Sequence, residues 1–230
     1  MLRVSVTTLE KFRRYIRETT PDDTEERLIE SIAGSFVGND YTRIGHSFHH
    51  ILERGFDKVI KDGSRFYCKG CYFSEAQLRL AIRYHKDYLF MVREVPTFKI
   101  YQVPNLGEVM ITCRIDGIEG REIRDTKLKF SPVRVDQFVD SYQWRAYLDI
   151  LDLDNFYFDP FYIEGYDPEK HGRDISSLTM TREDPIPCSR YDELTSEVHG
   201  LVIDFFQYIE AKQFFHLLKT ANLHEKNYLF

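Results

Sequence analysis

Cysteine is scarce in this sequence, and no apolar run is long enough to cross a membrane. A membrane-spanning helix needs about 20 consecutive apolar residues, and none is present among the 230 residues. The first residues, MLRVSVTTLEKFRRYI, also lack the apolar core and small-residue cleavage site of a signal peptide. The sequence therefore predicts a cytoplasmic protein with no membrane contact, whose cysteines stay reduced.

The 4 cysteines do not form a recognisable metal motif. Cys68 and Cys71 have the spacing of a metal knuckle, but a zinc site of this kind needs a matching second pair. Cys113 and Cys188 are single and far apart. Free thiols are favoured over zinc or an iron–sulfur cluster, and a zinc protein built on Cys68, Cys71 and the histidines is kept as a distant alternative.

Excess positive charge is also absent. The net charge of −6 gives no overall basic field that would attract nucleic acid or an anionic membrane. This argues against a protein that coats DNA non-specifically. It does not exclude a nuclease, because an acidic metal site is itself negative and a local groove can still be basic.

Linkers rich in glycine, serine or proline are missing, and no internal repeat is visible, so one domain over residues 1–230 is expected. Apolar spacing and end signals predict helices over residues 7–18, 21–34, 42–60, 74–94, 133–151 and 192–220. Alternating patterns predict strands over residues 97–103, 108–118, 120–130 and 155–166, the last interrupted at Pro160. Residues 165–190 are expected to form a long loop. This order predicts an α/β or α+β fold, with helices flanking a central mixed sheet.

The stretch CRIDGIEGREIRDTKLK places three charged side chains where a sheet usually places packing residues. Residues two apart in a strand share a face, so Asp125 and Lys127 should project together, and Asp116 ends the preceding strand. Two neighbouring carboxylates repel unless a cation lies between them, and hard oxygen ligands select Mg²⁺ or Mn²⁺. A lysine beside such an ion can orient or deprotonate water. Taken alone, however, the hairpin favours an ordinary surface ion pair.

Two helical motifs flank this hairpin. In GHSFHHILE, Gly45, His49 and Glu53 stack at four-residue steps, and His49 should face the body of the protein. His46 and His50 are also four apart, but no carboxylate or cysteine partner is near them in sequence.

The second motif is QWRAY, which follows the hairpin. Here Gln143 and Tyr147 are four apart on one side of the expected helix. Each motif has an ordinary explanation, a hydrogen-bonded core histidine in the first and the polar edge of a half-buried helix in the second.

The order of these pieces resembles the PD-(D/E)XK nuclease superfamily, and most of all its RecB-like or phage-type exonuclease branch. The matching motifs are GHSFH, RIDGI, RDTKL and QWRAY, and the opening VSVTTLEKFRRY also looks like that branch. The resemblance covers residues 4 to 151. It implies a restriction-endonuclease-like core over about residues 40–165, with N-terminal helices at 5–34 and a C-terminal extension at 166–230.

The resemblance also implies a role for each matched residue. His49, Asp116, Asp125 and the backbone carbonyl of Thr126 would bind Mg²⁺ or Mn²⁺, and Lys127 would position or activate the attacking water. Gln143 and Tyr147 would brace the site or contact the DNA backbone. Glu53 would lie behind the residues that bind the metal. Glu119, Glu122 and Lys129 are left as solvent-facing charges.

The activity implied is metal-dependent hydrolysis of DNA phosphodiester bonds by an exonuclease in recombination, repair or phage DNA processing. DNA is the expected partner, and a homo-oligomer is an option. The alternative is an inactive member of the same fold that serves as a nucleic-acid-binding or assembly module. Exonuclease or endonuclease action, strandedness, polarity and RNA tolerance are left open.

Overall fold

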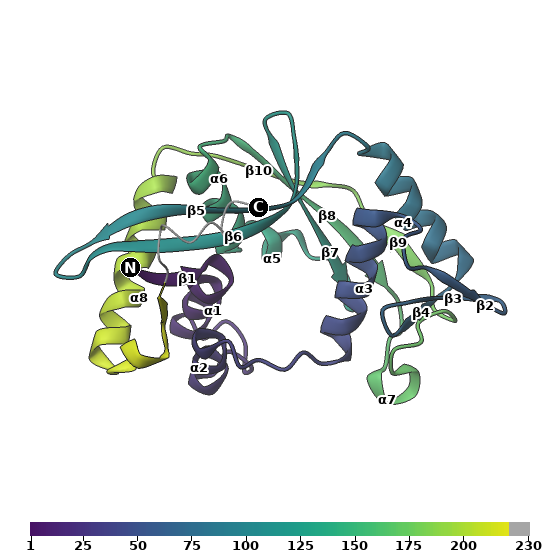
Figure 1. Cartoon of the computed structure of the whole chain (residues 1–230), viewed down its shortest axis with the longest axis horizontal. Helices are drawn as coiled ribbons and strands as arrows, with labels where there is room; N and C mark the ends of the chain where they lie inside the picture. Colours follow the sequence, from purple (N-terminus) through teal and green to yellow (C-terminus); the bar gives the residue numbers. More distant parts are fainter. Residues whose placement is uncertain (221–230) are drawn as a thin grey trace.

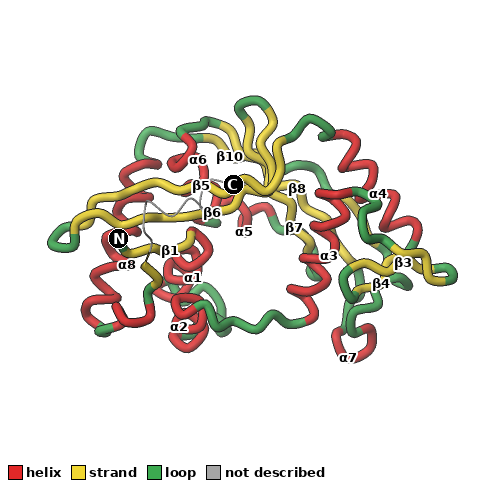
Figure 2. The backbone as a smooth tube through the Cα atoms, viewed as in Figure 1, coloured by secondary structure: helices red, strands yellow, loops and turns green. Residues whose placement is uncertain are grey.

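The structure is a computed structural model that describes residues 1–220, and its chain forms an arch (Figure 1). One limb contains α1, α2, β1 and α8, the other contains α3, α4, α7 and β2 to β4, and the large sheet joins them (Figure 2). The helices are α1 Val6–Ile16, α2 Glu25–Ala33, α3 Asp40–Arg54, α4 Glu75–Asp87, α5 Val135–Val139, α6 Tyr142–Leu151, α7 Pro168–His171, α8 Leu194–Ala211 and the 3₁₀ helix η1 Phe214–Leu217. The strands are β1 Leu2–Ser5, β2 Ile60–Asp62, β3 Arg65–Cys68, β4 Cys71–Phe73, β5 Val92–Val103, β6 Gly107–Glu119, β7 Glu122–Lys129, β8 Asn155–Ile163, β9 Met180–Arg182, β10 Ile186–Ser189 and β11 Lys219–Thr220.

The large sheet has eight strands and is mixed. Its main order is β10-β8-β7-β6-β1-β11, with β5 beside β6 and β9 beside β8. The β1–β6 and β7–β8 pairs are parallel and the other pairs are antiparallel. Strands β2, β3 and β4 form a separate small sheet. The predicted fold class, a central mixed sheet flanked by helices, is confirmed.

One edge of strand β6 pairs with two different strands, β1 and β7. Strand β5 pairs with β6 over nearly its whole length on the other edge. On the shared edge, β1 pairs with residues 109–112 and β7 with residues 117–119. Neither strand is paired with residues 113–116, and we call this interval the fork. Asp116 lies at its end.

Apolar side chains form two clusters along the sheet. In the first, α1, α6 and α8 pack with β6, whose Val109, Ile111 and Ile115 are fully buried, as the alternation predicts. In the second, α3 and α4 pack against the β3–β4 hairpin and the end of β8. No helix within residues 1–220 is long and apolar enough to span a bilayer.

Three expected helices are shorter than predicted. Helix α3 ends at Arg54 because Gly55 adopts φ 65°, which ends the helix. Helix α4 ends at Asp87, and the chain from Val92 onward joins the sheet as β5. The last helix stops at Ala211 and is followed by η1 and β11. Sheet pairing therefore overrides helical spacing in the first residues of β5.

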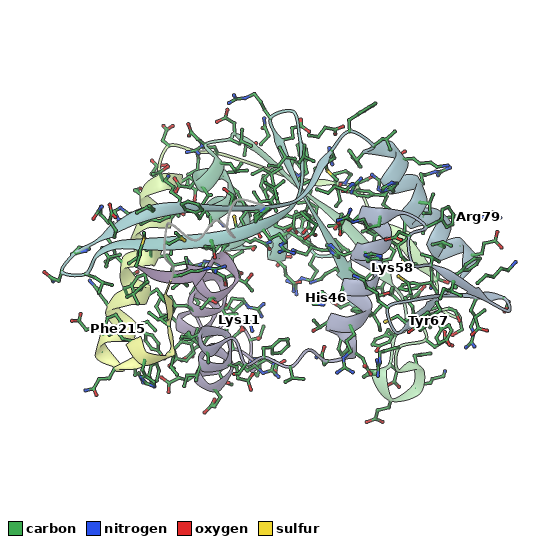
Figure 3. The ribbon with its side chains drawn as sticks, viewed as in Figure 1. Lys11, His46, Lys58, Tyr67, Arg79 and Phe215 are labelled. Carbon is green, nitrogen blue, oxygen red and sulfur yellow. The ribbon has the colours of Figure 1, made fainter. Side chains whose placement is uncertain are left out.

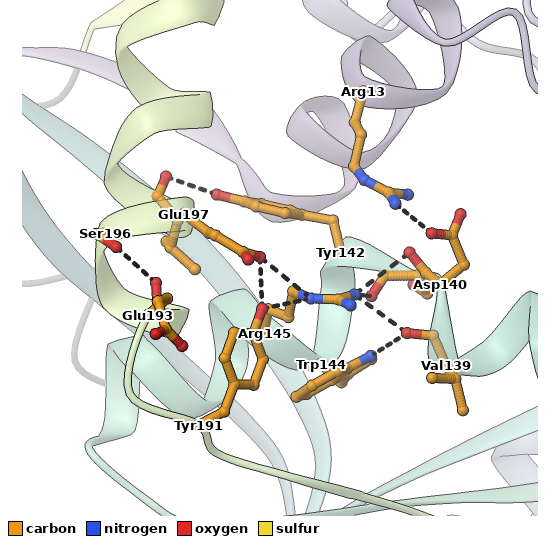
Figure 4. A network of polar contacts seen from close by, with 12 residues as sticks. Arg13, Val139, Asp140, Tyr142, Trp144, Arg145, Tyr191, Glu193, Ser196 and Glu197 are labelled. Atoms are coloured by element: carbon orange, nitrogen blue, oxygen red, sulfur yellow. Dashed lines mark hydrogen bonds and ion pairs between the residues drawn. The ribbon is translucent and has the colours of Figure 1, made fainter.

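The helix expected over residues 133–151 is broken into α5 and α6. Ser141 begins the second part by accepting a hydrogen bond from the backbone N–H of Gln143 at 3.2 Å. The guanidinium of Arg145 donates to the carbonyls of Val139, Asp140 and Ser141 at 3.1, 3.3 and 2.7 Å (Figure 4). These contacts satisfy the carbonyls at the break and fix the direction of α6.

The long loop expected over residues 165–190 is also wrong, because it contains α7, β9 and β10. The predicted interruption of the strand at Pro160 does not occur either. On the outer edge of β8, β10 pairs up to Phe158 and β9 pairs from Phe161. Pro160 lies between them, where its missing N–H breaks no ladder bond.

Candidate active site

At the fork, the side-chain carboxylate of Asp116 is hydrogen-bonded to Thr126 on the neighbouring strand β7. Its Oδ2 accepts hydrogen bonds from the backbone N–H of Thr126 at 2.9 Å and from the Thr126 hydroxyl at 3.1 Å. The same oxygen lies 3.5 Å from Nδ1 of His49 on α3. The Thr126 hydroxyl is 3.2 Å from each ring nitrogen of His49. Thus His49, Asp116 and Thr126 come together from three separate elements.

Asp125 and Lys127 form a second group on β7. Their side chains lie on the same side of the strand, with Nζ of Lys127 2.5 Å from Oδ2 of Asp125. Asp125 is 1% exposed, whereas the Lys127 side chain is 34% exposed. The buried Oδ2 of Asp125 makes no hydrogen bond of good geometry despite this short ion pair. This oxygen lies against the ammonium of Lys127, and a further ligand would share it with that group.

Burial and charge both act on this pair. Burial raises the pKa of Asp125 to about 6, with a further rise from the charge of Asp116, while Lys127 opposes both. Burial alone would lower the pKa of Lys127, but the charges of Asp125 and Asp116 outweigh it and raise that pKa. The lysine therefore stays protonated and holds the buried carboxylate in its ionised form.

Helix α6 supplies the next contacts. The side-chain amide of Gln143 donates to Oδ1 of Asp125 at 2.9 Å and to the hydroxyl of Tyr147 at 3.0 Å. The Tyr147 hydroxyl donates in turn to the backbone carbonyl of Arg114 at 3.1 Å. The QWRAY motif thus connects β7 to the fork, and its position depends on the break before α6 described above.

Glu53 and Glu94 add negative charge near the fork. Glu53, on α3, is ion-paired with Arg54 at 2.6 Å and is not in hydrogen-bond contact with Asp116 in the structure. Glu94, on β5, has a left-handed φ of 54°, and the register on either side places it opposite Asp116. Burial and the charges of Asp116 and Glu53 raise its pKa. Glu94 is not predicted as a site residue from the sequence, because its segment has the apolar spacing of a helix.

The glycine of the IDG motif has a packing role. A Cβ atom on Gly117 would lie 2.2 Å from Sδ and 2.7 Å from Cγ of Met91. Met91 is buried directly before β5, and the absence of a side chain at Gly117 leaves room for its thioether beside β6. The requirement is spatial and could not be seen in the sequence.

A buried ion pair supports β7 from behind. Arg124 precedes Asp125, and its Nη1 donates to both carboxylate oxygens of Asp159 on β8, at 3.0 and 3.1 Å. Tyr84 donates to the same carboxylate at 2.9 Å. The guanidinium also lies over the rings of Tyr88 and Tyr157, at 4.4 and 4.7 Å from their centroids. This network holds in place the part of β7 that carries Asp125.

The residues at the fork suit a hard divalent cation. Within residues 1–220, no three His, Cys, Asp or Glu side chains are arranged as a ready-made metal cage. Asp125 nevertheless presents a buried oxygen whose recorded contact is the ion pair with Lys127, and Asp116 and His49 lie across the same fork. The carbonyl of Thr126 points to the same edge of β7 as its N–H, toward Asp116. Carboxylate and carbonyl oxygens are the donors that Mg²⁺ and Mn²⁺ prefer.

The other motifs lie outside this group. His46 projects from α3 on the side facing α1 and Lys11 (Figure 3), and it is exposed. Nε2 of His50 is 3.9 Å from Asp57 and buried. Cys68 and Cys71 are buried free thiols facing each other across the turn of the β3–β4 hairpin. Burial raises the pKa of both thiols.

Comparison with known proteins gives limited likenesses. No protein-family model matches the chain, and no curated protein matches it in sequence. Among solved structures, the crystal structure of SSO0001 is 15% identical, with a TM-score of 0.46 over 90% of this chain and 76% of that one. LHK-Exo in complex with dAMP is 14% identical, with a TM-score of 0.42 over 91% of this chain and 88% of that one. At these scores neither likeness establishes function, which has to be judged from the fork itself.

Proposed function

We propose that this chain is a Mg²⁺- or Mn²⁺-dependent deoxyribonuclease that degrades DNA from its ends. One observation carries the proposal: Asp125 and Lys127 project together from β7, beside a fork in the sheet that holds Asp116 and His49. A buried carboxylate and a second carboxylate can hold a metal ion for phosphodiester hydrolysis, and an adjacent lysine can stabilise the charge that develops on the phosphate.

In this proposal, His49, Asp116, Asp125 and the Thr126 carbonyl hold the metal. When bound, the ion supplies positive charge to the attacking and leaving oxygens. Lys127 orients the attacking water and stabilises negative charge that develops on the phosphate. Its raised pKa suits this second role, since the side chain stays a cation at neutral pH. Gln143 keeps Asp125 in place through the hydrogen bond to Oδ1.

The first test is the metal dependence of DNA degradation. Purified protein is expected to shorten linear DNA when Mg²⁺ or Mn²⁺ is added and to stop when a chelator is added. Asp125→Asn, which keeps the shape of the side chain, should remove the activity while the protein remains folded. A covalently closed circle of the same sequence should resist if the enzyme needs an end. Wild type that leaves single-stranded and duplex DNA intact with both metals would contradict the proposal.

Zinc binding at Cys68 and Cys71 can be tested with the same purified protein. Metal analysis of the purified protein and of Cys68→Ser should give no stoichiometric zinc in either. Tightly held zinc that is lost in Cys68→Ser would instead support a zinc-binding role for Cys68 and Cys71.

A further inference from the structure

A surface hollow opens where β7 ends, next to the proposed catalytic group. It has a volume of about 340 Å³ and is lined by Tyr41, Leu128, Lys129, Phe130 and Ser131. Lys129 follows Lys127 by two residues, so the two side chains leave the strand on the same side, about 6.5–7 Å apart. That separation is similar to the spacing of neighbouring phosphates along an extended nucleic-acid strand.

Lys129 is an uncompensated positive charge. It was expected to face solvent, but it is half-buried, with Nζ 5.4 Å from the centroid of the Phe138 ring. Within residues 1–220 it forms no ion pair with a carboxylate. Burial lowers its pKa, and the nearby charges of Lys127 and Arg14 lower it further. In a chain with a net charge of −6, this is a place where an anion would be stabilised.

The other side of the hollow is aromatic. The ring of Tyr41 is 5.0 Å from the ring of Phe130 and 5.1 Å from that of Tyr166, in edge-to-face contacts. Tyr41 is nevertheless 40% exposed. The acidic neighbour of Tyr41, Asp40, is paired with Arg173 at 3.2 Å and lies 3.9 Å from Arg43. Its charge is therefore largely balanced and does not repel an incoming phosphate.

We propose that this hollow holds the nucleotide next to the scissile phosphate, with Lys129 binding its phosphate and Tyr41 stacking on its base. The inference rests on the proposed nuclease function, because it places the DNA strand along β7. A cationic group that follows the backbone, combined with an exposed aromatic ring, is the usual means of holding single-stranded nucleic acid without reading its sequence. Lys129 and Tyr41 are positioning residues and take no part in bond cleavage.

The test measures DNA binding without cleavage, in the presence of a chelator. The main variant is Lys129→Met, which removes the charge but keeps an aliphatic chain over Phe138. Each lost phosphate contact lowers the magnitude of the slope of log K against log salt by about 0.7 for single strands or 0.9 for duplex DNA. We expect that loss, together with an about five- to tenfold weaker Kd at moderate salt. Lys129→Arg should keep both values near wild type.

The control is Lys61→Met, at an exposed lysine on β2 in the small sheet, and it should leave Kd and slope unchanged. Tyr41→Leu tests the aromatic half of the hollow. Loss of a stacking contact should weaken single-strand binding by at least about fivefold while the salt slope stays at its wild-type value. The two variants thus separate a charge contact from a stacking contact.

The outcomes distinguish this inference from the nuclease proposal. If wild type degrades DNA but Lys129→Met retains the wild-type slope, Kd and KM, the hollow is not a nucleotide site and the nuclease proposal stands. If wild type never hydrolyses DNA but binds it with a slope that depends on Lys129, the hollow is a nucleic-acid-binding site and the nuclease proposal fails. In an active enzyme, Lys129→Met should raise KM with kcat close to wild type. A fall in kcat with unchanged KM would overturn the positioning role.

Discussion

Nζ of Lys127 lies 2.5 Å from Oδ2 of Asp125, a carboxylate that is almost completely buried. Because a buried charge is costly without a partner, the lysine stabilises the ionised carboxylate in the protein itself. A group proposed to act on the attacking water therefore also stabilises the fold.

The stability of Lys127→Met tests this pairing. Removal of the ammonium leaves Asp125 buried without its cation, which should lower the free energy of unfolding by about 1–3 kcal/mol at pH 8, a figure reduced because Lys127 is partly exposed. The loss should be smaller at pH 5, below the pKa of about 6, where the carboxyl is mostly neutral. Urea unfolding at the two pH values, without metal, measures both. An equal loss at both pH values would contradict the account.

Glu10 offers a separate test of burial against charge. Its carboxylate accepts the N–H of Tyr142 at 2.6 Å, but burial raises its pKa above the ordinary value. As pH rises past 4.5, the unfolded chain loses the proton of Glu10 while the folded protein still holds it. The free energy of unfolding therefore falls with pH until the pKa of Glu10 in the folded protein is passed. Each pKa unit corresponds to about 1.4 kcal/mol. Glu10→Gln should raise the free energy of unfolding at neutral pH and make it depend less on pH.

The matched control for Glu10 is Glu210→Gln, at an exposed position in the last turn of α8. It should leave the pH dependence of unfolding as in wild type. Glu10→Gln that is less stable than wild type at pH 7 would show that the ionised form is favoured in the folded protein.

Gly117→Ala tests the close packing beside Asp116. The new methyl group would overlap the thioether end of Met91, at 2.2 Å from Sδ and 2.6 Å from Cε, so this side chain must move out of its buried position. Overpacking of this kind costs about 1–3 kcal/mol. In a double-mutant cycle with Met91→Ala, much of the loss should be recovered, because the smaller side chain makes room. Strictly additive losses would place the cause of the destabilisation elsewhere.

Arg124→Met tests the support behind β7. The change leaves the buried carboxylate of Asp159 without its cation and should cost about 3–5 kcal/mol. Arg121→Met, at an exposed arginine in the turn directly before β7, should cost less than about 0.5 kcal/mol. Thermal unfolding of the two variants compares them directly, and similar losses would mean that the Arg124–Asp159 pair has no special role.

The local signals of the sequence predict the elements that carry the motifs. Gly45, His49 and Glu53 lie on one helix, and Asp125 and Lys127 lie on one strand, because periods of 3.6 and 2 depend only on neighbouring residues. The fold class follows from the order of these elements. Serine or threonine caps also mark several helix starts, such as Ser74 at α4.

What the sequence does not reveal depends on distant contacts. The fork exists because β1 takes part of the edge of β6 that β7 also uses, and the β1–β6 pairs join residues 107 positions apart. Glu94 enters the site only because β5 pairs with β6, and the surroundings of Lys129 depend on α1 and α5. No local pattern encodes these neighbours, so helical spacing in residues 88–94 gave the wrong element.

The most direct test of the central claim is the single-turnover rate of linear DNA hydrolysis by wild type and Lys127→Met, both at saturating Mn²⁺. Mn²⁺ affinity is measured separately by isothermal titration calorimetry. The account predicts rapid hydrolysis by wild type and a rate lower by about 10³-fold or more in the variant, with Mn²⁺ still bound by both proteins. Equal rates in the two proteins, or no hydrolysis by a wild type that binds Mn²⁺ and DNA, would contradict it.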